Sequence, residues 1–380
     1  MKIAIVGTGF VADYYMTTLR NYPQLTLTSV YDRSPERLRA FCAHYSLRAY
    51  ESLDALLADP QVDIVVNLTT PESHAAISRA ALASGKHVYS EKPLAMDFGE
   101  ARALVDFARE KGLTLAAAPA NALSDARHLA ALALADIGTP RLVYAEMEDG
   151  PVFRDKWTTW RSRSGAPWPG LHEFEIGCTL EHAGYALSWL VSLFGPVESV
   201  TAFSAVTFPD KGPGTGHLRM APDFSVGCLR FRSGLVARLT SGLAMPRDRS
   251  LTVVGDRGSL TVDDLWNNRS AVRLQRTGDG KRFAARLFDN LETRLGRFLV
   301  WKPATGKKLA YPKSAPSVLP SYPSQIDFMR GIADQARAIE NGGTAFFSGE
   351  VALHITEIAL ALNNAGDRAE PYRVQSSFQP

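Results

Sequence analysis

The sequence predicts an α/β N-terminal domain followed by an α+β domain built on a large, mostly antiparallel open sheet. Over the first 120 residues, short apolar runs alternate with amphipathic stretches, which is typical of a parallel sheet covered by helices on both faces. After residue 140, apolar runs are linked by Gly-containing turns with few helices between them, which favours antiparallel pairing. A chain of 380 residues accommodates two domains, and we place them at residues 1–120 and 121–380.

The first domain is expected to alternate strands with helices. Its strands are predicted at Lys2–Val6, Leu25–Tyr31, Ile64–Leu68, His87–Tyr89 and Leu113–Ala118. Amphipathic helices are expected between them, for example at Ala75–Ala83 and Gly99–Arg109. Gly85 and Gly112 stand just beyond these two stretches, at a position where glycine commonly ends a helix.

The second domain is expected to contain many strands and few helices. Strands are predicted at Arg141–Glu148, Val197–Phe203, Phe224–Phe231, Leu235–Ser241, Leu251–Val254 and Ser259–Val262. Helices are predicted at Ser124–Ala135, Gly177–Phe194, Gln325–Asn341 and Gly349–Asn364, and His354 is interpreted as a packed residue of the last one. If the Gly177–Phe194 helix covers one face of the sheet, the other face exposes apolar area, so we expect a homodimer or homotetramer.

Composition narrows the class of protein. The formal net charge is only +3, from 42 basic and 39 acidic residues, and we expect no nucleic-acid partner. Three cysteines without a C-x-x-C pair favour a reducing compartment. The sequence has neither the roughly 18-residue apolar run of a membrane helix nor a signal-peptide pattern, because Met1–Val6 leads directly into a glycine turn. We therefore expect a cytoplasmic protein.

Residues 264–313 form a basic segment. It contains twelve Lys or Arg and four Asp or Glu, an excess of +8, so the rest of the chain carries 3 − 8 = −5. Within it, Leu287–Trp301 has apolar residues near helical spacing. An anionic membrane surface or a nucleotide phosphate would suit such a segment, but we favour a packed helix with a solvated basic face.

A glycine-rich motif follows the first predicted strand. Gly7, Gly9 and Ala12 match the G-x-G-x-x-G/A pattern of a Rossmann dinucleotide site, in which the glycines allow a tight turn and close approach of the pyrophosphate. Asp32 lies at the end of the second strand, where a carboxylate binds the ribose hydroxyls. NAD is therefore favoured over NADP, although Arg33 could accept a 2′-phosphate. The alternative is a plain strand–helix turn.

Several stretches resemble the Gfo/Idh/MocA oxidoreductase family. They are Glu91-Lys92-Pro93 with the preceding Ala81–Val88, the segment Thr69–His74, and the closing Ser348–His354. The resemblance implies hydride transfer between a nicotinamide cofactor and a sugar, a cyclitol or a nucleotide-linked sugar. It also implies these cofactor-binding residues: Gly7, Thr8, Gly9, Phe10, Val11, Asp32, Arg33, Leu68, Thr69, Thr70, Pro71, His74, Glu91, Lys92 and Asn121.

The predicted catalytic helix departs from the family pattern. Family members usually carry an Asp and, four residues later, a His, whereas this chain has Glu181 and Tyr185; some members also carry Tyr there. We expect Lys92 to polarise the substrate oxygen and Tyr185 to act as general acid/base. A free phenol has a pKa of about 10, so a nearby cation is required at neutral pH. His182, three residues before Tyr185, is a second candidate for proton transfer.

The segment before this helix is rich in aromatic and basic side chains. Indole rings stack on sugars or bases, and arginines bind phosphates or carboxylates, so we expect a nucleotide-linked or otherwise anionic sugar. The expected substrate-binding residues are Lys92, Trp157, Trp160, Arg161, Arg163, Trp168, His172 and Tyr185. Aromatic packing or a subunit contact is the alternative. His172-Glu173 lacks the second His of H-E-x-x-H, and we expect no metal.

Two other functions remain open at this point. One is a non-catalytic NAD-binding regulator, which the replaced family His favours and the intact Glu91-Lys92-Pro93 opposes. The other is NAD-dependent, redox-neutral glycoside hydrolysis. Net NADH production distinguishes a dehydrogenase from both. The run from Glu173 to Tyr185 also resembles a branch of the family associated with polysaccharide or nucleotide-sugar metabolism.

Overall fold

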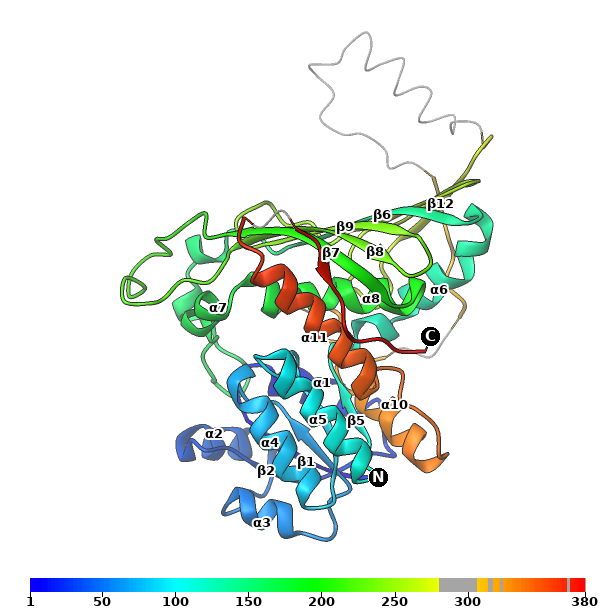
Figure 1. Ribbon diagram of the computed structural model, residues 1–380. Helices are drawn as coiled ribbons and strands as arrows, with labels where there is room; N and C mark the ends of the chain where they lie inside the picture. The colour runs from blue at the N-terminus through cyan, green and yellow to red at the C-terminus, as the bar shows by residue number, and fades with distance from the viewer. Residues whose placement is uncertain (280–305, 314–316, 322–323, 368–369, 380) are drawn as a thin grey trace.

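The computed structural model describes residues 1–279, 306–313, 317–321, 324–367 and 370–379. The N-terminal domain lies below a broad sheet, and helices α6, α8 and α11 lie between the two (Figure 1). This arrangement confirms the predicted fold class, an α/β domain joined to an α+β domain. The expected helix at Leu287–Trp301 falls outside the described residues.

The N-terminal sheet is wholly parallel, with strand order β2-β1-β3-β4-β5. β1 (Lys2–Val6) and β3 (Ile64–Asn67) are mostly apolar, and Ile3, Ala4 and Ile5 are fully buried, as expected for a sheet covered on both faces. Ser34 and Asp97 cap α2 and α5 by accepting hydrogen bonds from backbone amides. The elements are β1 (Lys2–Val6), α1 (Ala12–Leu19), β2 (Thr26–Tyr31), α2 (Pro35–Tyr45), α3 (Leu53–Ala58), β3 (Ile64–Asn67), α4 (Pro71–Ala83), β4 (His87–Ser90), α5 (Phe98–Glu110) and β5 (Leu115–Ala117).

The second sheet has nine strands in the order β13-β12-β11-β10-β6-β9-β8-β7-β14. All neighbours pair antiparallel except the central β6 and β9, which are parallel, so the expectation of a mostly antiparallel sheet is confirmed. The strands are β6 (Pro140–Glu148), β7 (Val197–Ala205), β8 (Phe224–Phe231), β9 (Val236–Gly242), β10 (Leu251–Gly255), β11 (Gly258–Val262), β12 (Val272–Arg276), β13 (Lys307–Lys308) and β14 (Tyr372–Arg373).

The helical region around residue 177 differs from the single helix predicted at Gly177–Phe194. The structure has α7 (Gly170–Ile176), a π-helical turn at Thr179–Ala183 and α8 (Gly184–Phe194). Gly177 ends α7 with φ +95°, a conformation that favours glycine. The remaining short elements are α6 (Asp125–Ala133) and 3₁₀ turns at Ala120–Leu123, Leu134–Ile137, Val152–Arg154 and Trp157–Thr159.

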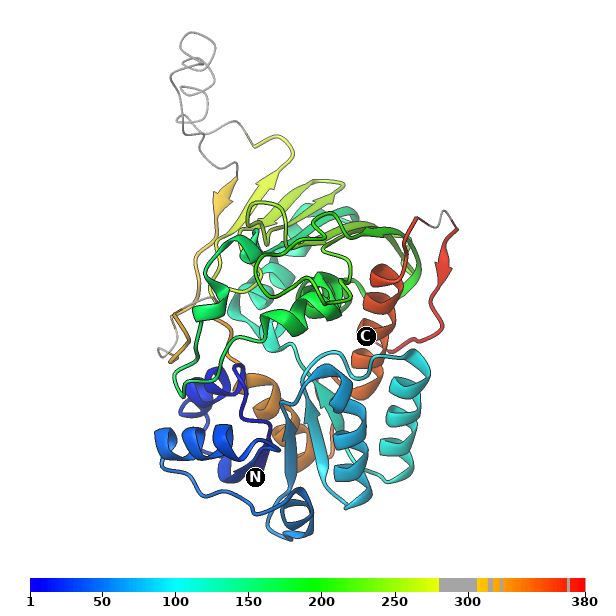
Figure 2. The same cartoon turned by 90° about the vertical axis from the view of Figure 1, so that its left-hand side faces the viewer.

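The last two helices, α10 (Met329–Glu340) and α11 (Gly349–Asn363), return to the N-terminal domain, beside which they lie in Figures 1 and 2. The side chain of Gln335 donates to the carbonyl oxygens of Val88 and Thr114. A β-bridge also joins Ala116 of β5 to Ser348. Residues beyond 121 therefore help to cover the first sheet, and the division at residue 120 stays a prediction.

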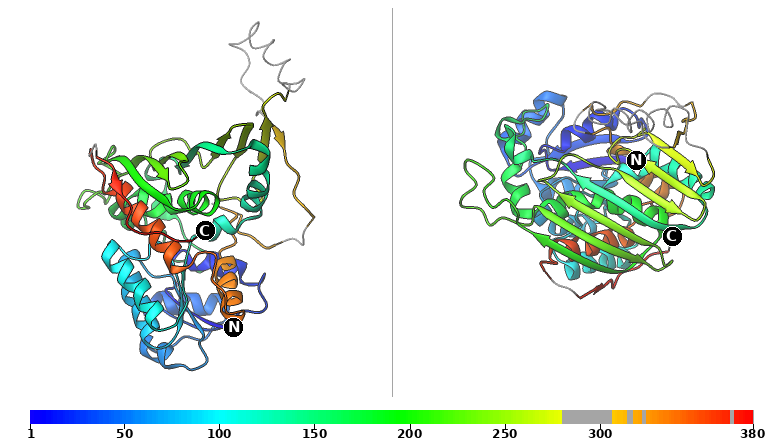
Figure 3. Two further views of the ribbon diagram at one scale, coloured as in Figure 1. Left: turned by 45° about the vertical axis from the view of Figure 1, so that its right-hand side comes forward. Right: turned by 90° about the horizontal axis from the view of Figure 1, so that it is seen from above.

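The outer face of the second sheet carries no helix in the described part of the chain (Figure 3). Tyr144 on β6, Phe203 on β7 and Val254 on β10 are each at least 36% exposed. The predicted homodimer or homotetramer stays a prediction. His354 is fully buried and accepts a hydrogen bond from the backbone amide of Val197, as a packed residue would. Among the described helices, none is both long and apolar enough to cross a membrane.

We predict that Gly331→Ala lowers the free energy of unfolding by about 1–3 kcal/mol, because α10 packs closely on β4. A Cβ atom at Gly331 would lie 2.8 Å from ring atoms of Tyr89, a side chain that is 1% exposed. Chemical denaturation measures the change. Gly343→Ala is the control, since its Cβ would meet nothing nearer than 3.9 Å; equal stability of the two variants would contradict the packing described.

Candidate active site

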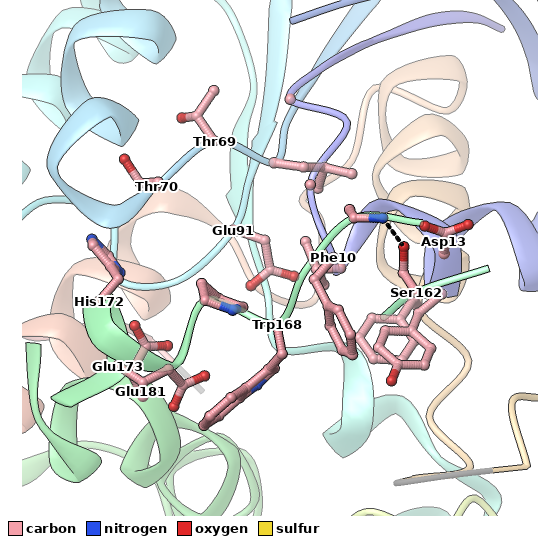
Figure 4. A pocket seen from close by; sticks show the side chains of 18 of the residues that line it. Phe10, Asp13, Thr69, Thr70, Glu91, Ser162, Trp168, His172, Glu173 and Glu181 are labelled. Atoms are coloured by element: carbon pink, nitrogen blue, oxygen red, sulfur yellow. Dashed lines mark hydrogen bonds between the residues drawn. The ribbon is translucent and has the colours of Figure 1, made fainter. Parts of the chain in front are cut away.

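A cavity of about 920 Å³ lies between the two domains. The carboxyl ends of β1, β2, β3 and β4 form one side, and residues 149–185 with Trp266 form much of the other. In Figure 4, Thr69, Thr70 and Glu91 come from the N-terminal domain, whereas Trp168, His172, Glu173 and Glu181 come from the second. A ligand in the cavity therefore contacts both domains.

The glycine turn at the end of β1 fits a dinucleotide. Gly7 has φ +99°, and a Cβ there would lie 2.5 Å from the carbonyl oxygen of Leu68. A Cβ at Gly9 would meet nothing within 4 Å, so this glycine borders open space in the cavity. Among the described residues, no side chain caps α1, although the backbone amide of Ala12 donates to the carbonyl oxygen of Gly9 at 3.2 Å. A helix N-terminus without a side-chain cap suits a phosphate group.

Asp32 lies at the far end of this cradle and is 6% exposed. It accepts hydrogen bonds from the backbone amide of Thr8 at 2.8 Å and from Arg37 at 2.9 Å. Burial alone would raise the pKa of Asp32, but the hydrogen bonds from Arg37, Ser34 and Thr8 hold it below its usual value. Arg33 and Arg37 both line the cavity, whereas Thr8 is buried beneath it.

The segment after β3 lines the middle of the cavity. Leu68, Thr69, Thr70, Pro71 and His74 all lie there, together with Phe10 and Val11. The ring of His74 lies 2.7 Å from the carbonyl oxygen of Pro93 and 3.1 Å from that of Thr69. These contacts tie the segment after β3 to the Glu91-Lys92-Pro93 turn after β4.

Lys92 and Glu181 form an ion pair across the two domains. The Nζ atom of Lys92 lies 2.7 Å from Oε2 of Glu181 and 5.6 Å from the centre of the Tyr185 ring. Burial alone would lower the pKa of Lys92, but Glu181, Tyr185 and Glu91 raise it well above its usual value. Lys92 is therefore a cation at neutral pH and lies beside the Tyr185 ring, and its part in proton transfer stays a prediction.

Tyr185 keeps its proton in this arrangement. Burial raises the pKa of its phenol, and the lowering effect of Lys92 does not offset burial together with Glu91 and Glu181. The phenol is therefore a proton donor, and loss of its proton requires further stabilisation of the phenolate. Its ring packs at 4.8 Å against Trp266.

His182 faces two carboxylates that sequence analysis missed. Its Nε2 atom lies 3.8 Å from Oδ2 of Asp149 and 3.8 Å from Oε2 of Glu173. Burial lowers the pKa of His182 despite the opposing effect of Asp149, so the ring is neutral at pH 7. Asp149 directly follows β6 and Glu173 lies on α7; no local motif indicated that they meet.

The segment from Trp160 to His172 crosses the mouth of the cavity. Ser164 donates from its backbone amide and hydroxyl to Asp13 of α1, at 3.0 and 2.7 Å. On the other side, Nε2 of His172 lies 2.7 Å from Glu72 of α4. The predicted substrate-binding residues Trp160, Arg161, Arg163, Trp168 and His172 all line the cavity.

Trp157 and Asn121 do not line the cavity. Trp157 is 8% exposed and packs edge-on against Trp168 and Phe174, which matches the alternative of aromatic packing. The side-chain amide of Asn121 donates to the backbone oxygens of Tyr185 and Leu265. The side chain of Asn121 thereby links the 3₁₀ turn at Ala120–Leu123 to α8, and its predicted contact with the cofactor stays a prediction.

Comparison with known proteins identifies the family. Residues 1–118 match the family model described as "Oxidoreductase family, NAD-binding Rossmann fold", and residues 130–261 match the "GFO/IDH/MocA C-terminal domain". The chain belongs to the Gfo/Idh/MocA oxidoreductase family. The resemblance predicted from the sequence is thereby confirmed.

Individual relatives of this family are diverse. The chain is 40% identical over 289 residues to a dTDP-3,4-didehydro-2,6-dideoxy-alpha-D-glucose 3-reductase of Streptomyces violaceoruber, covering 73% of this chain and 78% of that one. It is 33% identical over 146 residues to a UDP-N-acetylglucosamine 3-dehydrogenase of Acidithiobacillus ferrooxidans, covering 38% and 45% of the two chains. In this and a second relative, the matched part spans about half of the relative's length.

A solved structure shares the fold over almost the whole chain. The WlbA dehydrogenase from Bordetella pertussis, in complex with NADH and UDP-GlcNAcA, superposes with a TM-score of 0.70. The alignment covers 98% of this chain and 97% of that one at 19% identity. At this identity the similarity shows the Gfo/Idh/MocA fold and does not identify the substrate.

The acidic residue of the predicted catalytic helix lies next to the lysine of Glu91-Lys92-Pro93. Glu181 occupies the family's Asp position and binds Lys92, as an acidic residue there must in order to neutralise a buried ammonium. Tyr185 replaces the family's His four residues later. Among the described residues, no group of three or more His, Cys, Asp or Glu is arranged to hold a metal.

We predict that Glu148→Gln stabilises the fold at high pH only. Glu148 is 4% exposed at the end of β6, and burial with Asp248 and Asp149 raises its pKa to about 7. Because the folded-state pKa lies above the ordinary value, the stability contributed by protonated Glu148 is lost as the pH rises through about 7. The glutamine variant should therefore be more stable by about 1–3 kcal/mol at pH ~8.5 and nearly equal to wild type at pH ~5.

Urea denaturation at these two pH values measures the effect. Glu175→Gln is the control, because Glu175 is exposed on α7. A difference between Glu148→Gln and wild type that does not change with pH would contradict a buried, titrating carboxyl.

Proposed function

We propose that this protein is an NAD-dependent oxidoreductase that transfers a hydride between nicotinamide and a carbon bearing the hydroxyl or carbonyl oxygen of a sugar-like substrate. The observation that carries the proposal is the Lys92–Glu181 pair beside Tyr185, at the end of a cavity whose other end is a dinucleotide cradle. Hydride transfer at a carbinol carbon requires a group that moves a proton at the oxygen. Lys92 and Tyr185 supply that group here.

Each residue has a distinct part in the reaction. Gly7 and Gly9 accommodate the dinucleotide, and Asp32 binds its ribose hydroxyls. When bound, the nicotinamide accepts or supplies the hydride. Lys92 donates a hydrogen bond to the reacting oxygen and stabilises negative charge there. Tyr185 gives its proton to that oxygen during reduction and takes one back during oxidation, with Lys92 stabilising the phenolate.

His182 is a second candidate for proton transfer. The neutral ring has one nitrogen able to accept a proton, and it lines the same cavity as Tyr185. Glu181 acts through Lys92, which it holds within reach of the substrate. The Nε2 atom of His182 lies 3.8 Å from both Asp149 and Glu173, too far for direct proton transfer to either carboxylate.

The substrate that we propose is a nucleotide-linked or otherwise anionic sugar. Trp160 and Trp168 offer aromatic faces at the cavity wall. Arg163 and Arg247 also line the cavity and can bind phosphate or carboxylate. Two relatives are named for nucleotide-sugar substrates, which supports this class without identifying a member of it.

We predict net NADH formation when NAD is supplied with a suitable sugar, cyclitol or nucleotide sugar. Lys92→Ala and Tyr185→Phe should each lower kcat/KM by about 10²-fold or more, because proton transfer at the substrate oxygen is lost. Absorbance at 340 nm measures turnover, and Lys111→Ala, which alters an exposed lysine after α5, is the control.

Two results would contradict a dehydrogenase. Tight cofactor binding without turnover on any substrate would favour a regulator. Glycosidase activity without net NADH would favour redox-neutral hydrolysis. Activity that survives Tyr185→Phe would transfer the acid/base role to His182 or to Lys92 alone.

We predict that NAD binds more tightly than NADP by roughly tenfold, because Asp32 repels a 2′-phosphate. Asp32→Ser should reverse the preference, since it removes that charge and releases Arg37, which Asp32 holds at 2.9 Å. Fluorescence titration of both cofactors measures the ratio, with the exposed Asp54→Ser on α3 as control. Equal affinity of wild type for NAD and NADP would contradict the proposed preference.

A further inference from the structure

Three side chains form an acidic end to the cavity beyond Lys92 and Tyr185. Glu173 comes from α7, Asp149 from the residue after β6, and His182 from the π-helical turn. Their side chains are 12%, 14% and 10% exposed, and all three line the cavity. Figure 4 shows Glu173 beside Glu181 at the cavity wall.

Two buried polar atoms at this acidic end have no hydrogen-bond partner in the described part of the chain, whereas Oδ1 of Asp149 accepts from Arg249 at 3.4 Å. Oε2 of Glu173 and Nδ1 of His182 are buried without a hydrogen-bond partner there. The 3.8 Å separations of His182 Nε2 from Asp149 and from Glu173 are too long for direct hydrogen bonds. His182 is 8% exposed as a whole residue.

Lys92 and Arg249, two cationic side chains near Glu173, already have other acidic partners. Lys92 binds Glu181 at 2.7 Å. Arg249 lies 3.4 Å from Asp149, but its other terminal nitrogen binds Asp264 at the shorter distance of 2.8 Å. Glu173 therefore faces the cavity as a carboxyl group with no ion-pair partner among the described residues.

A carboxylate in such a place must gain either a proton or a cation, because an isolated buried charge is costly. A primary ammonium group carries both the charge and several N–H donors. Oε2 of Glu173 and Oδ2 of Asp149 each lie 3.8 Å from Nε2 of His182, so two carboxylate acceptors lie near one ring nitrogen. A hydroxyl group donates a single hydrogen bond and leaves one of these two carboxylates unmet.

We propose that the acidic end formed by Glu173, Asp149 and His182 is a subsite for an ammonium group of the substrate, which makes the substrate an amino sugar or an aminocyclitol. The assignment rests on the proposed function for the sugar-like nature of the ligand. It adds a cationic substituent to that sugar-like ligand.

The competing possibility is that Glu173 takes up a proton and binds a hydroxyl. The charged and titratable groups that face Glu173 are Asp149, Glu181, Lys92 and His182. Burial and then Glu181 raise the pKa of Glu173 while Lys92 lowers it, so the site without ligand favours the protonated form. A bound ammonium adds a cation and restores the carboxylate, whereas a neutral sugar does not.

Binding of three related sugars to the full-length protein tests the proposal. Glucosamine, glucose and N-acetylglucosamine share one ring and differ at a single substituent, and glucosamine carries an ammonium at about pH 6.5. Calorimetric titration with NAD present should show glucosamine binding roughly tenfold or more tightly than glucose, with N-acetylglucosamine similar to glucose. Equal affinities for glucosamine and glucose in wild type would overturn the proposal, and this comparison needs no variant.

Glu173→Gln should reduce glucosamine affinity to that of glucose, because the amide has nearly the same shape but no charge. Glu175→Gln, an exposed position on the same helix, should leave the preference unchanged. Circular dichroism melting checks that both variants fold, and Glu173→Asp should restore part of the preference. A preference for glucosamine that survives Glu173→Gln would overturn the subsite.

The binding experiment can reject the ammonium subsite without rejecting the proposed oxidoreductase function, and the reverse also holds. Glu173-dependent glucosamine binding without NADH formation on any substrate would leave the subsite standing and reject the oxidoreductase. NADH formation with a sugar that lacks an amino group, unchanged by Glu173→Gln, would leave the oxidoreductase standing and reject the subsite.

Discussion

The ion pair between Lys92 and Glu181 is the interaction on which the site depends. Lys92 leaves the end of β4 in the N-terminal domain, and Glu181 comes from the π-helical turn before α8, 89 residues later in the chain. Because both side chains are nearly buried, neither charge is tolerated without the other. The pair therefore fixes the second domain over the dinucleotide cradle and places Tyr185, four residues after Glu181, beside the lysine.

Buried hydrogen bonds on both sides of the ion pair hold its two residues in place. Asn121 connects the start of the second domain to the backbone of Tyr185 and Leu265, and Ser188 of α8 donates to the same amide. The carboxylate of Glu91 accepts from the Tyr15 hydroxyl at 2.6 Å and from the backbone amide of Lys92. Polar networks of this kind specify one arrangement, since each lost partner leaves a buried group unpaired.

Sequence reasoning located the parts of the site that lie in contiguous motifs. Gly7, Gly9 and Asp32 follow from strand, turn and spacing, and Glu91-Lys92-Pro93 and Glu181 follow from family resemblance. It could not find Asp13, Asp149 or Glu173, because each acquires its role from a partner distant in sequence, such as Ser164 for Asp13. The sequence also did not predict the break at Gly177 or the parallel pairing of β6 with β9, because both depend on tertiary packing and non-local register.

The ion pair between Lys92 and Glu181 limits which substrate groups can bind in the part of the cavity near Tyr185. A lysine already paired with Glu181 can polarise an oxygen, but it does not also neutralise an anionic substituent. The other titratable groups there are Glu173, Asp149 and neutral His182, and Arg249 already donates to Asp149 at 3.4 Å. Because burial raises the pKa of Glu173, its carboxyl group is protonated without a nearby ligand cation and ionised beside one. The ammonium subsite that we propose depends on this change of charge at Glu173.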